Sequence, residues 1–390
     1  MLFIRTCLIL VIVFPLSRSF DLFVSFLMQK EPCFETIDFE HCNSSIPEPF
    51  TPVYKGTDTN VPNSEFWLFT TKNKERAEPL HKCGGKLPEN SAFDPEQETI
   101  IIAGGVAESI CRVAWQREYK DQFFVKGNYN VILVDWTWGN FPDPVGGVTN
   151  SYVVGEQMGF VIKNIMLQNN YEDGSKFYLI GHSAGSYVVT TACKFIREWK
   201  SSHKIRRMTL LEPGVVNIKE REFPQTTAYQ EAHFVDVMHS NGGTCFPQIV
   251  GQIKPIGHAD FYPNGGVLEL SCYYEIVEAI LKGDSLYAIV SILVPPICNH
   301  LQVLQFYKVS INHPAGLQIG AMCDNYEDFL SGACKRCCRK DFSNCAVAGF
   351  DAEHYFPHKG EPRKERKYYY EIGLVCPYNE NYEFSILKDC

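Results

Sequence analysis

The pentapeptide GHSAG at residues 181–185 places a serine between two glycines, in the pattern Gly-x-Ser-x-Gly. An apolar stretch, residues 177–180, ends directly before it, and a stretch of helical periodicity, residues 186–199, begins directly after it. A strand, a sharp turn and a helix in that order form a nucleophile elbow, which raises the serine hydroxyl above the edge of a sheet. The two glycines leave room for the turn, because a side chain at either position would clash. We therefore predict that Ser183 is the nucleophile of an acyl-transfer reaction.

A serine hydroxyl becomes an effective nucleophile only when a base removes its proton and an acid orients that base. Glu212 directly follows the apolar stretch 208–211, and His300 lies further on, in CNHL at residues 298–301. The order serine, acid, histidine is the one that accompanies a nucleophile elbow. Other acids and bases stay open as candidates, although a structural role suits the histidines and Asp236 better: His233, His239, His258, Asp236 and Asp260.

The tetrahedral intermediate of acyl transfer needs two main-chain N–H groups directed at its oxyanion. One is expected from Ala184, the residue after the nucleophile. The second is expected from Gly105, at the end of the stretch IIIAGG at residues 100–105. Two successive glycines allow the main chain to approach a substrate closely, which favours this loop as the second donor.

The elements that must position these residues alternate along the chain. Helical patterns at residues 153–166 and 186–199 lie between apolar stretches that we expect to be strands, at residues 99–103, 131–136, 177–180, 208–211 and 234–239. Apolar strands separated by helices predict a parallel sheet covered on both faces. After residue 316 the chain is rich in cysteine, tyrosine and charge, and we expect a loop-rich, disulfide-tied tail.

The composition indicates where the protein resides and which class of partner its charge disfavours. The chain has 390 residues, with 36 basic and 45 acidic ones, and a net charge of −9 argues against nucleic acid as a partner. Sixteen cysteines are too many for an ordinary cytosolic enzyme. Residues 1–19 have a positive charge at Arg5, then a short apolar stretch and small residues near residue 19, which predicts a secretory signal peptide. We expect a secreted, extracellular protein with a glycosylation sequon at Asn43, and we expect no membrane-spanning helix.

Taken together, the motifs resemble the pancreatic-lipase family of secreted α/β-hydrolases from about residue 33 to about residue 370. The most specific are VDW at 134–136, GHSAG, LLEP at 210–213, FVDVMHSNGG at 234–243, GHADFYPNGG at 257–266 and CNHL. The resemblance implies the α/β-hydrolase fold, with a central, mostly parallel sheet flanked by helices. It also implies hydrolysis of carboxylic esters at a lipid–water interface without a metal or an organic cofactor. The implied roles are nucleophile for Ser183, acid for Glu212, base for His300, and oxyanion donors for Gly105 and Ala184.

The resemblance further implies a lid at residues 273–297, closed by a disulfide between Cys272 and Cys298. Through this lid we expect peripheral contact with a membrane or lipid droplet, while protein partners stay unspecified. A lid of this length favours acylglycerols as substrates. A phospholipase A1 or galactolipase, or a catalytically silent lipid-binding or yolk-type relative, remains an alternative. Further expected disulfides are Cys33–Cys42, Cys323–Cys334, and Cys345 with either Cys337 or Cys338; the pairings of Cys83, Cys111, Cys193, Cys245, Cys376 and Cys390 stay open.

Four departures from the family pattern are expected to matter. Glu212 stands where the family usually has aspartate, and Ala103 stands before the oxyanion glycine where the family has histidine. The family's calcium-binding stretch is reduced essentially to Glu231, so we expect no calcium there. We also expect no C-terminal β-sandwich domain. The expected organisation is a signal peptide at residues 1–19 and one lipase domain at residues 20–390, with a cysteine-rich extension from about residue 317.

Overall fold

The computed structural model describes residues 64–80, 86–106, 108–111, 113–136, 144–216, 228–242, 249–269, 271–272, 295–312, 318–334, 337, 342–361 and 364–372. The expected signal peptide, the Cys33–Cys42 pair, the Asn43 sequon and residues 273–294 of the expected lid lie outside these residues. The chain forms two compact units, described here one at a time. The first unit comprises residues 28–235, and the second comprises residues 236–390 with residues 1–27.

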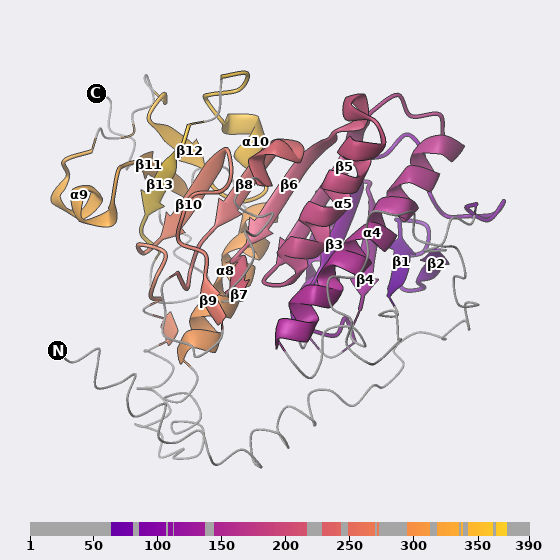
Figure 1. Cartoon of the computed structure of the whole chain (residues 1–390), viewed down its shortest axis with the longest axis horizontal. Helices are drawn as coiled ribbons and strands as arrows, with labels where there is room; N and C mark the ends of the chain where they lie inside the picture. The colour runs from indigo at the N-terminus through magenta and orange to yellow at the C-terminus, as the bar shows by residue number, and fades with distance from the viewer. Residues whose placement is uncertain are drawn as a thin grey trace, which may run out of the picture. The chain divides into compact units, whose positions relative to one another are not determined.

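The first unit is built on a sheet with the strand order β6-β5-β3-β4-β1-β2 (Figure 1). Its four central strands are parallel: β3 (Thr99–Ala103), β4 (Asn130–Asp135), β5 (Gly174–His182) and β6 (Ile205–Leu211). At one edge, β1 (Glu65–Phe69) and β2 (Glu78–Leu80) add antiparallel strands. The short β7 (Gly214–Val216) follows β6 in the chain. The predicted α/β architecture with a mostly parallel sheet is therefore confirmed.

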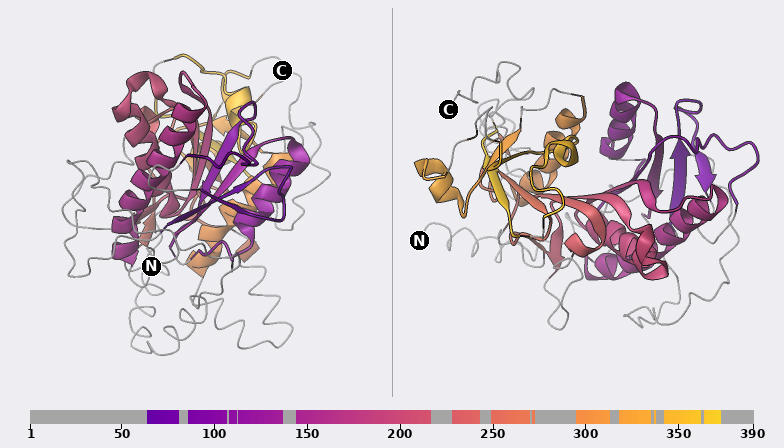
Figure 2. Two further views of the ribbon diagram at one scale, coloured as in Figure 1. Left: turned by 90° about the vertical axis from the view of Figure 1, so that its right-hand side faces the viewer. Right: turned by 90° about the horizontal axis from the view of Figure 1, so that it is seen from above.

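Helices cover both faces of this sheet. Figure 2 shows α3 (Trp115–Lys126) on one face and the pair α4 (Pro144–Gln168) and α5 (Gly185–Trp199) on the other, and the short 3₁₀ helix η2 (Ser201–His203) follows α5. This explains why the central strands read as continuous apolar runs, since Ile100, Ile101 and Ile102 are all fully buried. Among the described residues, no helix has both the length and the apolar character needed to cross a bilayer.

Small residues let α4 and α5 pack closely. A Cβ atom at Gly155 would lie 2.5 Å from Cβ of Thr191, and one at Gly159 would lie 2.6 Å from the ring of Phe195. The ring of Phe195 in turn packs on Phe160 of α4, with centroids 4.8 Å apart. This contact holds α5, the helix that begins two residues after Ser183, against its neighbour. The same helix buries Cys193, which is a free cysteine.

The second unit has its own strands, in the order β12-β11-β13-β10-β8. The strand β8 (Ala232–Met238) enters it at residue 236 and is parallel to β10 (Ala259–Pro263), which is parallel to β13 (Lys367–Tyr370). The strands β11 (Ile319–Met322) and β12 (Cys345–Val347) are antiparallel. The remaining elements are β9 (Ile249–Gly251), α8 (Pro295–Asn312), α9 (Tyr326–Ser331) and α10 (Ala352–Tyr355).

The tail beyond residue 316 is less loop-rich than its composition predicts, because it supplies β11, β12 and β13. Aromatic packing accounts for the strand β13. Tyr368 stacks on Phe261 and Tyr369 stacks on Tyr262, with centroids 5.4 and 5.0 Å apart. Buried aromatic side chains that stack across neighbouring strands stabilise strand pairing.

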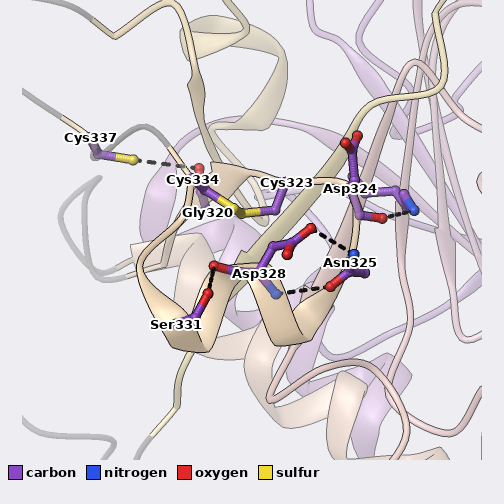
Figure 3. Close-up of a disulfide and its surroundings, with 9 residues drawn as sticks. Gly320, Cys323, Asp324, Asn325, Asp328, Ser331, Cys334 and Cys337 are labelled. Atoms are coloured by element: carbon purple, nitrogen blue, oxygen red, sulfur yellow. Dashed lines mark hydrogen bonds between the residues drawn. A yellow bond between two sulfur atoms is a disulfide. The ribbon is translucent and has the colours of Figure 1, made fainter.

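Disulfides tie several of these segments. Cys323 and Cys334 are joined across α9, which begins where the side chain of Asn325 accepts the N–H of Asp328 at 2.8 Å (Figure 3). The other described pairs are Cys272–Cys298 and Cys337–Cys345, and Cys111 is also disulfide-bonded.

Candidate active site

Ser183 occupies a sharp turn between β5 and α5. Its φ is +52°, a left-handed conformation that a residue other than glycine adopts only at a cost. A Cβ atom at Gly185 would lie 2.2 Å from the carbonyl oxygen of Ala103, and one at Gly181 would lie 2.4 Å from that of Gly185. Only glycine fits either position, so the geometry is that of the predicted elbow. Ser183 is partly exposed, whereas the preceding His182 is fully buried.

Glu212 lies at the same edge of the sheet. The strands β5 and β6 are parallel and end in register, with His182 opposite Leu211. The main-chain N–H of Ser183 donates to the carbonyl of Leu211 at 3.0 Å. Glu212 directly follows Leu211, is fully buried, and has a φ of +43°. Ser183 and Glu212 therefore follow the carboxyl ends of neighbouring parallel strands, where ligands bind in open α/β sheets.

The loop after β3 brings Gly105 against Ser183. A Cβ atom at Gly105 would lie 2.7 Å from Cβ of Ser183 and 3.2 Å from its Oγ. The indole N–H of Trp136, from the end of β4, donates to the carbonyl of Gly104 at 3.0 Å and holds this loop. The structure thus brings together four of the predicted site residues in the first unit, since Ala184 is covalently next to Ser183.

Glu108 is a further residue of this loop, and the sequence-based prediction missed it. The N–H of Gly105 donates to Oε2 of Glu108 at 2.6 Å, and the N–H of Glu108 donates back to the carbonyl of Gly105 at 3.3 Å. The other carboxylate oxygen, Oε1, lies 2.7 Å from Nδ1 of His182. The available signal was the position of Glu108 three residues after Gly105, from which a side chain can bond to the preceding main chain.

His300 lies in the second unit, on α8, and is partly exposed. The preceding residue anchors this part of the helix. The carbonyl of Asn299 accepts the hydroxyl of Ser240 at 2.8 Å, and its side-chain oxygen accepts the N–H of Glu269 at 3.0 Å. Asn299 is buried. Because His300 and Ser183 belong to different units, their pairing stays a prediction.

His239, one of the alternative bases, has a different environment. Its Nε2 lies 3.0 Å from Oδ1 of Asp260, and its ring stacks on Tyr262 with centroids 4.4 Å apart. Asp260 also accepts the main-chain N–H groups of Ile256 and Gly257, each at 3.0 Å. Both His239 and Asp260 are fully buried, which suits the structural role expected of this histidine. The remaining alternatives are exposed His233, partly exposed His258 and buried Asp236.

Sequence comparison bears on this arrangement. The profile of the Lipase family matches residues 41–378, which is most of the chain. The chain belongs to the Lipase family. The predicted resemblance is therefore confirmed, and with it the α/β-hydrolase expectation for the fold.

Individual relatives of this Lipase family chain are only moderately similar to it. Pancreatic triacylglycerol lipase of Cavia porcellus is 27% identical over 303 residues, covering 77% of this chain and 62% of the relative. Inactive pancreatic lipase-related protein 1 of Mus musculus is also 27% identical, over 325 residues, covering 80% of this chain and 66% of the relative. Among solved structures, an esterase of Pyrobaculum calidifontis matches 44% of this chain and 51% of its own, at 14% identity and a TM-score of 0.23.

Glu231, the acid to which the calcium-binding stretch is expected to be reduced, forms an ion pair in this chain. The carboxylate of Glu231 is buried and pairs with the guanidinium of Arg197, with Nε 2.7 Å from Oε2 and Nη2 3.3 Å from Oε1. This bond raises the pKa of Arg197. No group of three or more His, Cys, Asp or Glu side chains within the described residues could hold a metal ion. A carboxylate already engaged by a guanidinium does not fit a hard cation, which prefers several free oxygen ligands.

Proposed function

We propose that this chain is a secreted serine lipase that hydrolyses ester bonds of acylglycerols at a lipid–water interface. The observation that carries the proposal is the left-handed φ of +52° at Ser183, between two glycines that no other residue could replace. Membership of the Lipase family supports it. The matched relatives include a triacylglycerol lipase and, at the same identity, a lipase-related protein named as inactive, so the decisive experiment measures activity directly.

In the proposed mechanism, Oγ of Ser183 attacks the acyl carbonyl while His300 takes its proton. Glu212 orients the imidazole and stabilises its charged form. The N–H groups of Ala184 and Gly105 hold the oxyanion of the tetrahedral intermediate. His300 then delivers the proton to the departing alcohol, and a water molecule, activated by the same histidine, hydrolyses the acyl-enzyme. The close packing of Gly105 on Ser183 supports its assignment as a donor, and Glu212 supports the acid because it ends the strand next to the nucleophile.

The position of His300 supports its role in a different way. It lies on a helix that the Cys272–Cys298 disulfide and Asn299 tie to the rest of the second unit. A base must keep one orientation during both acylation and deacylation, and an anchored helix can hold His300 in that orientation. The expected lid ends at residue 297, within the first turn of this helix, and its residues 273–294 lie outside the described part of the chain.

The experiment compares the secreted full chain with Ser183→Ala on two substrates, trioleoylglycerol emulsion and phosphatidylcholine vesicles. A fluorophosphonate probe measures the reactivity of the nucleophile independently of the lipid. We expect labelling and triacylglycerol hydrolysis in the wild type and neither in Ser183→Ala. Hydrolysis of phosphatidylcholine alone would assign a phospholipase A1 instead. A folded wild type that neither labels nor hydrolyses would identify a silent relative.

The acid and the base are tested in the same assays. Glu212→Ala and His300→Ala are expected to lose at least 10³-fold in turnover, as other members of a catalytic triad do. Glu212→Asp should retain a large share of the activity. Normal hydrolysis by Glu212→Ala, together with loss of hydrolysis in Asp236→Ala, would assign the role of the acid to Asp236.

Sequencing the amino terminus of the secreted protein tests the expected cleavage after residue 19.

A further inference from the structure

The structure points to a second role for the loop after β3, and this inference rests on the proposed function of Ser183 and Gly105. We propose that Glu108 is a gate of the oxyanion hole. In the resting chain its carboxylate occupies the N–H of Gly105, and it moves to Gln116 when an acyl group binds.

The closed state follows from the contacts of Glu108. Its Oε2 accepts the N–H of Gly105 at 2.6 Å, a short distance typical of a charge-assisted hydrogen bond. An amide has one hydrogen to donate, so an ester oxygen has to displace the carboxylate before this N–H can serve it. A carboxylate that stayed there would also repel the negative charge that develops on the substrate. Glu108 is only 8% exposed, so little solvent screens that repulsion.

The open state is suggested by an unusual neighbour. Gln116 of α3 is fully buried, and in the part of the chain that the structure describes, neither polar atom of its carboxamide has a hydrogen-bond partner. Leaving such a group unpaired is costly, so an unpaired buried amide calls for an explanation. Its nitrogen lies where it can receive the carboxylate. A Cβ atom at Gly104 would lie 2.5 Å from Nε2 of Gln116 and 3.0 Å from Oε2 of Glu108.

Glu108 can exchange Gly105 for Gln116 while it keeps its contact with His182. Nδ1 of His182 lies 2.7 Å from Oε1 of Glu108, and the buried histidine ring is packed edge-on against Trp115, with centroids 5.9 Å apart. A rotation of the carboxylate about this anchor replaces the bond to Gly105 by one to Nε2 of Gln116. One hydrogen bond is broken and one is formed, so two arrangements of similar free energy exist, as a gate requires.

The kinetic test uses p-nitrophenyl butyrate, a soluble ester, and four proteins: wild type, Glu108→Ala, Gln116→Met and the double variant. Glu108→Ala removes the carboxylate from the N–H of Gly105, so kcat/KM is expected to rise at least threefold. Gln116→Met keeps the volume but removes the open-state donor, so kcat/KM is expected to fall at least threefold. In the Glu108→Ala background the Gln116→Met change should have no effect, because there is no carboxylate left to receive.

Controls separate the gate from a structural role. Glu96→Ala removes a largely exposed carboxylate from the same unit and should leave kcat/KM unchanged. Glu108→Gln keeps the size of the side chain and removes its charge, so it serves if the alanine variant folds poorly, and it should also raise kcat/KM. The gate would be wrong if Glu108→Ala and Gln116→Met each lowered kcat/KM by a similar factor and the double variant lowered it by the product of the two factors.

A second measurement does not depend on hydrolysis. In protein labelled with ¹³C and ¹⁵N in glycine and alanine, the amide signal of Gly105 can be assigned, because Gly104–Gly105 is the one Gly-Gly pair of the sequence that follows an alanine. A bond to a carboxylate should shift its proton downfield, and Glu108→Ala should move it upfield by about 1 ppm or more. If the Gly105 proton has the same shift in wild type and in Glu108→Ala, and the enzyme is active, the gate is wrong and the proposed function stands. If neither the wild type nor Glu108→Ala hydrolyses the ester, the proposed function is wrong as well.

Discussion

The main-chain N–H of Ser183 donates to the carbonyl oxygen of Leu211 across 3.0 Å, which ties the turn after β5 to the end of β6. The residue after Leu211 is Glu212, so this bond fixes the position of the main chain of Glu212 relative to Ser183. Both Ser183 and Glu212 have a positive φ, at +52° and +43°. Each such conformation costs about 1–3 kcal/mol, and two together at one sheet edge indicate a site that the fold holds against strain.

The glycines of the elbow should tolerate no side chain. Gly185→Ala would place a Cβ atom 2.2 Å from the carbonyl oxygen of Ala103, and the main chain of β3 would have to shift. We expect the free energy of unfolding to fall by about 3 kcal/mol and hydrolysis to be lost, as measured by urea unfolding and ester turnover. Gly127→Ala is the matched control, because its nearest neighbour would be 3.4 Å away. Equal stability of the two variants would contradict the close packing.

The ion pair of Arg197 and Glu231 should stabilise the first unit without calcium. Arg197→Ala leaves a buried carboxylate without its guanidinium, and we expect a loss of about 1–3 kcal/mol in urea unfolding. Lys176→Ala removes an ion pair with the exposed Glu96 at 3.9 Å and should cost below about 0.5 kcal/mol. The Tm of the wild type should be the same in calcium and in EDTA. A Tm that rises with calcium would show that a cation binds after all.

Glu156 should make stability depend on pH. Burial raises the pKa of Glu156 from 4.5 to about 7, and nearby Lys194 lowers it only in part. The folded chain therefore keeps this proton at pH values where the unfolded chain has lost it, so stability falls as the pH rises from 4.5 to about 7. Glu156→Gln removes this penalty. It should stabilise the chain by about 1–2 kcal/mol at pH 8 and by nothing at pH 4. An equal effect at both pH values would contradict the assignment.

Asn299 should act as a positioning residue for His300. Asn299→Ala removes the acceptor for the N–H of Glu269 and loosens this part of α8. If His300 is the base, kcat should fall about tenfold with KM nearly unchanged, because the interaction matters during proton transfer and not in substrate binding. Asn312→Ala, at the far end of the same helix, is the control. An unchanged kcat in Asn299→Ala, despite a lower Tm, would limit this residue to stability.

The central strands and the elbow could be predicted because their signals are local. The run of isoleucines at 100–102 is buried on both faces, and Gly181 is required by its contact with Gly185 within the turn itself. The predicted strand at 99–103 accordingly coincides with β3, while β5 extends beyond the predicted stretch at both ends.

What the sequence could not reveal depends on contacts between distant segments. The strand β13 is short and follows a charged stretch, and the stacking of its tyrosines on Phe261 and Tyr262 shows why it joins β10. Glu108 looks like an ordinary loop carboxylate until its bond to Gly105 is seen. The ion pair of Arg197 and Glu231 likewise links residues from separate elements, so no spacing rule could have found it.

Cys193 gives the chain an internal reporter of its own opening. The thiol lies on the buried side of α5, and that burial raises its pKa, so an alkylating reagent in solution meets neither a thiolate nor an exposed sulfur. Its rate of alkylation, measured by peptide mass spectrometry, therefore reports how often α5 opens locally. The same sulfur would record whether contact with lipid loosens that helix or leaves it in place.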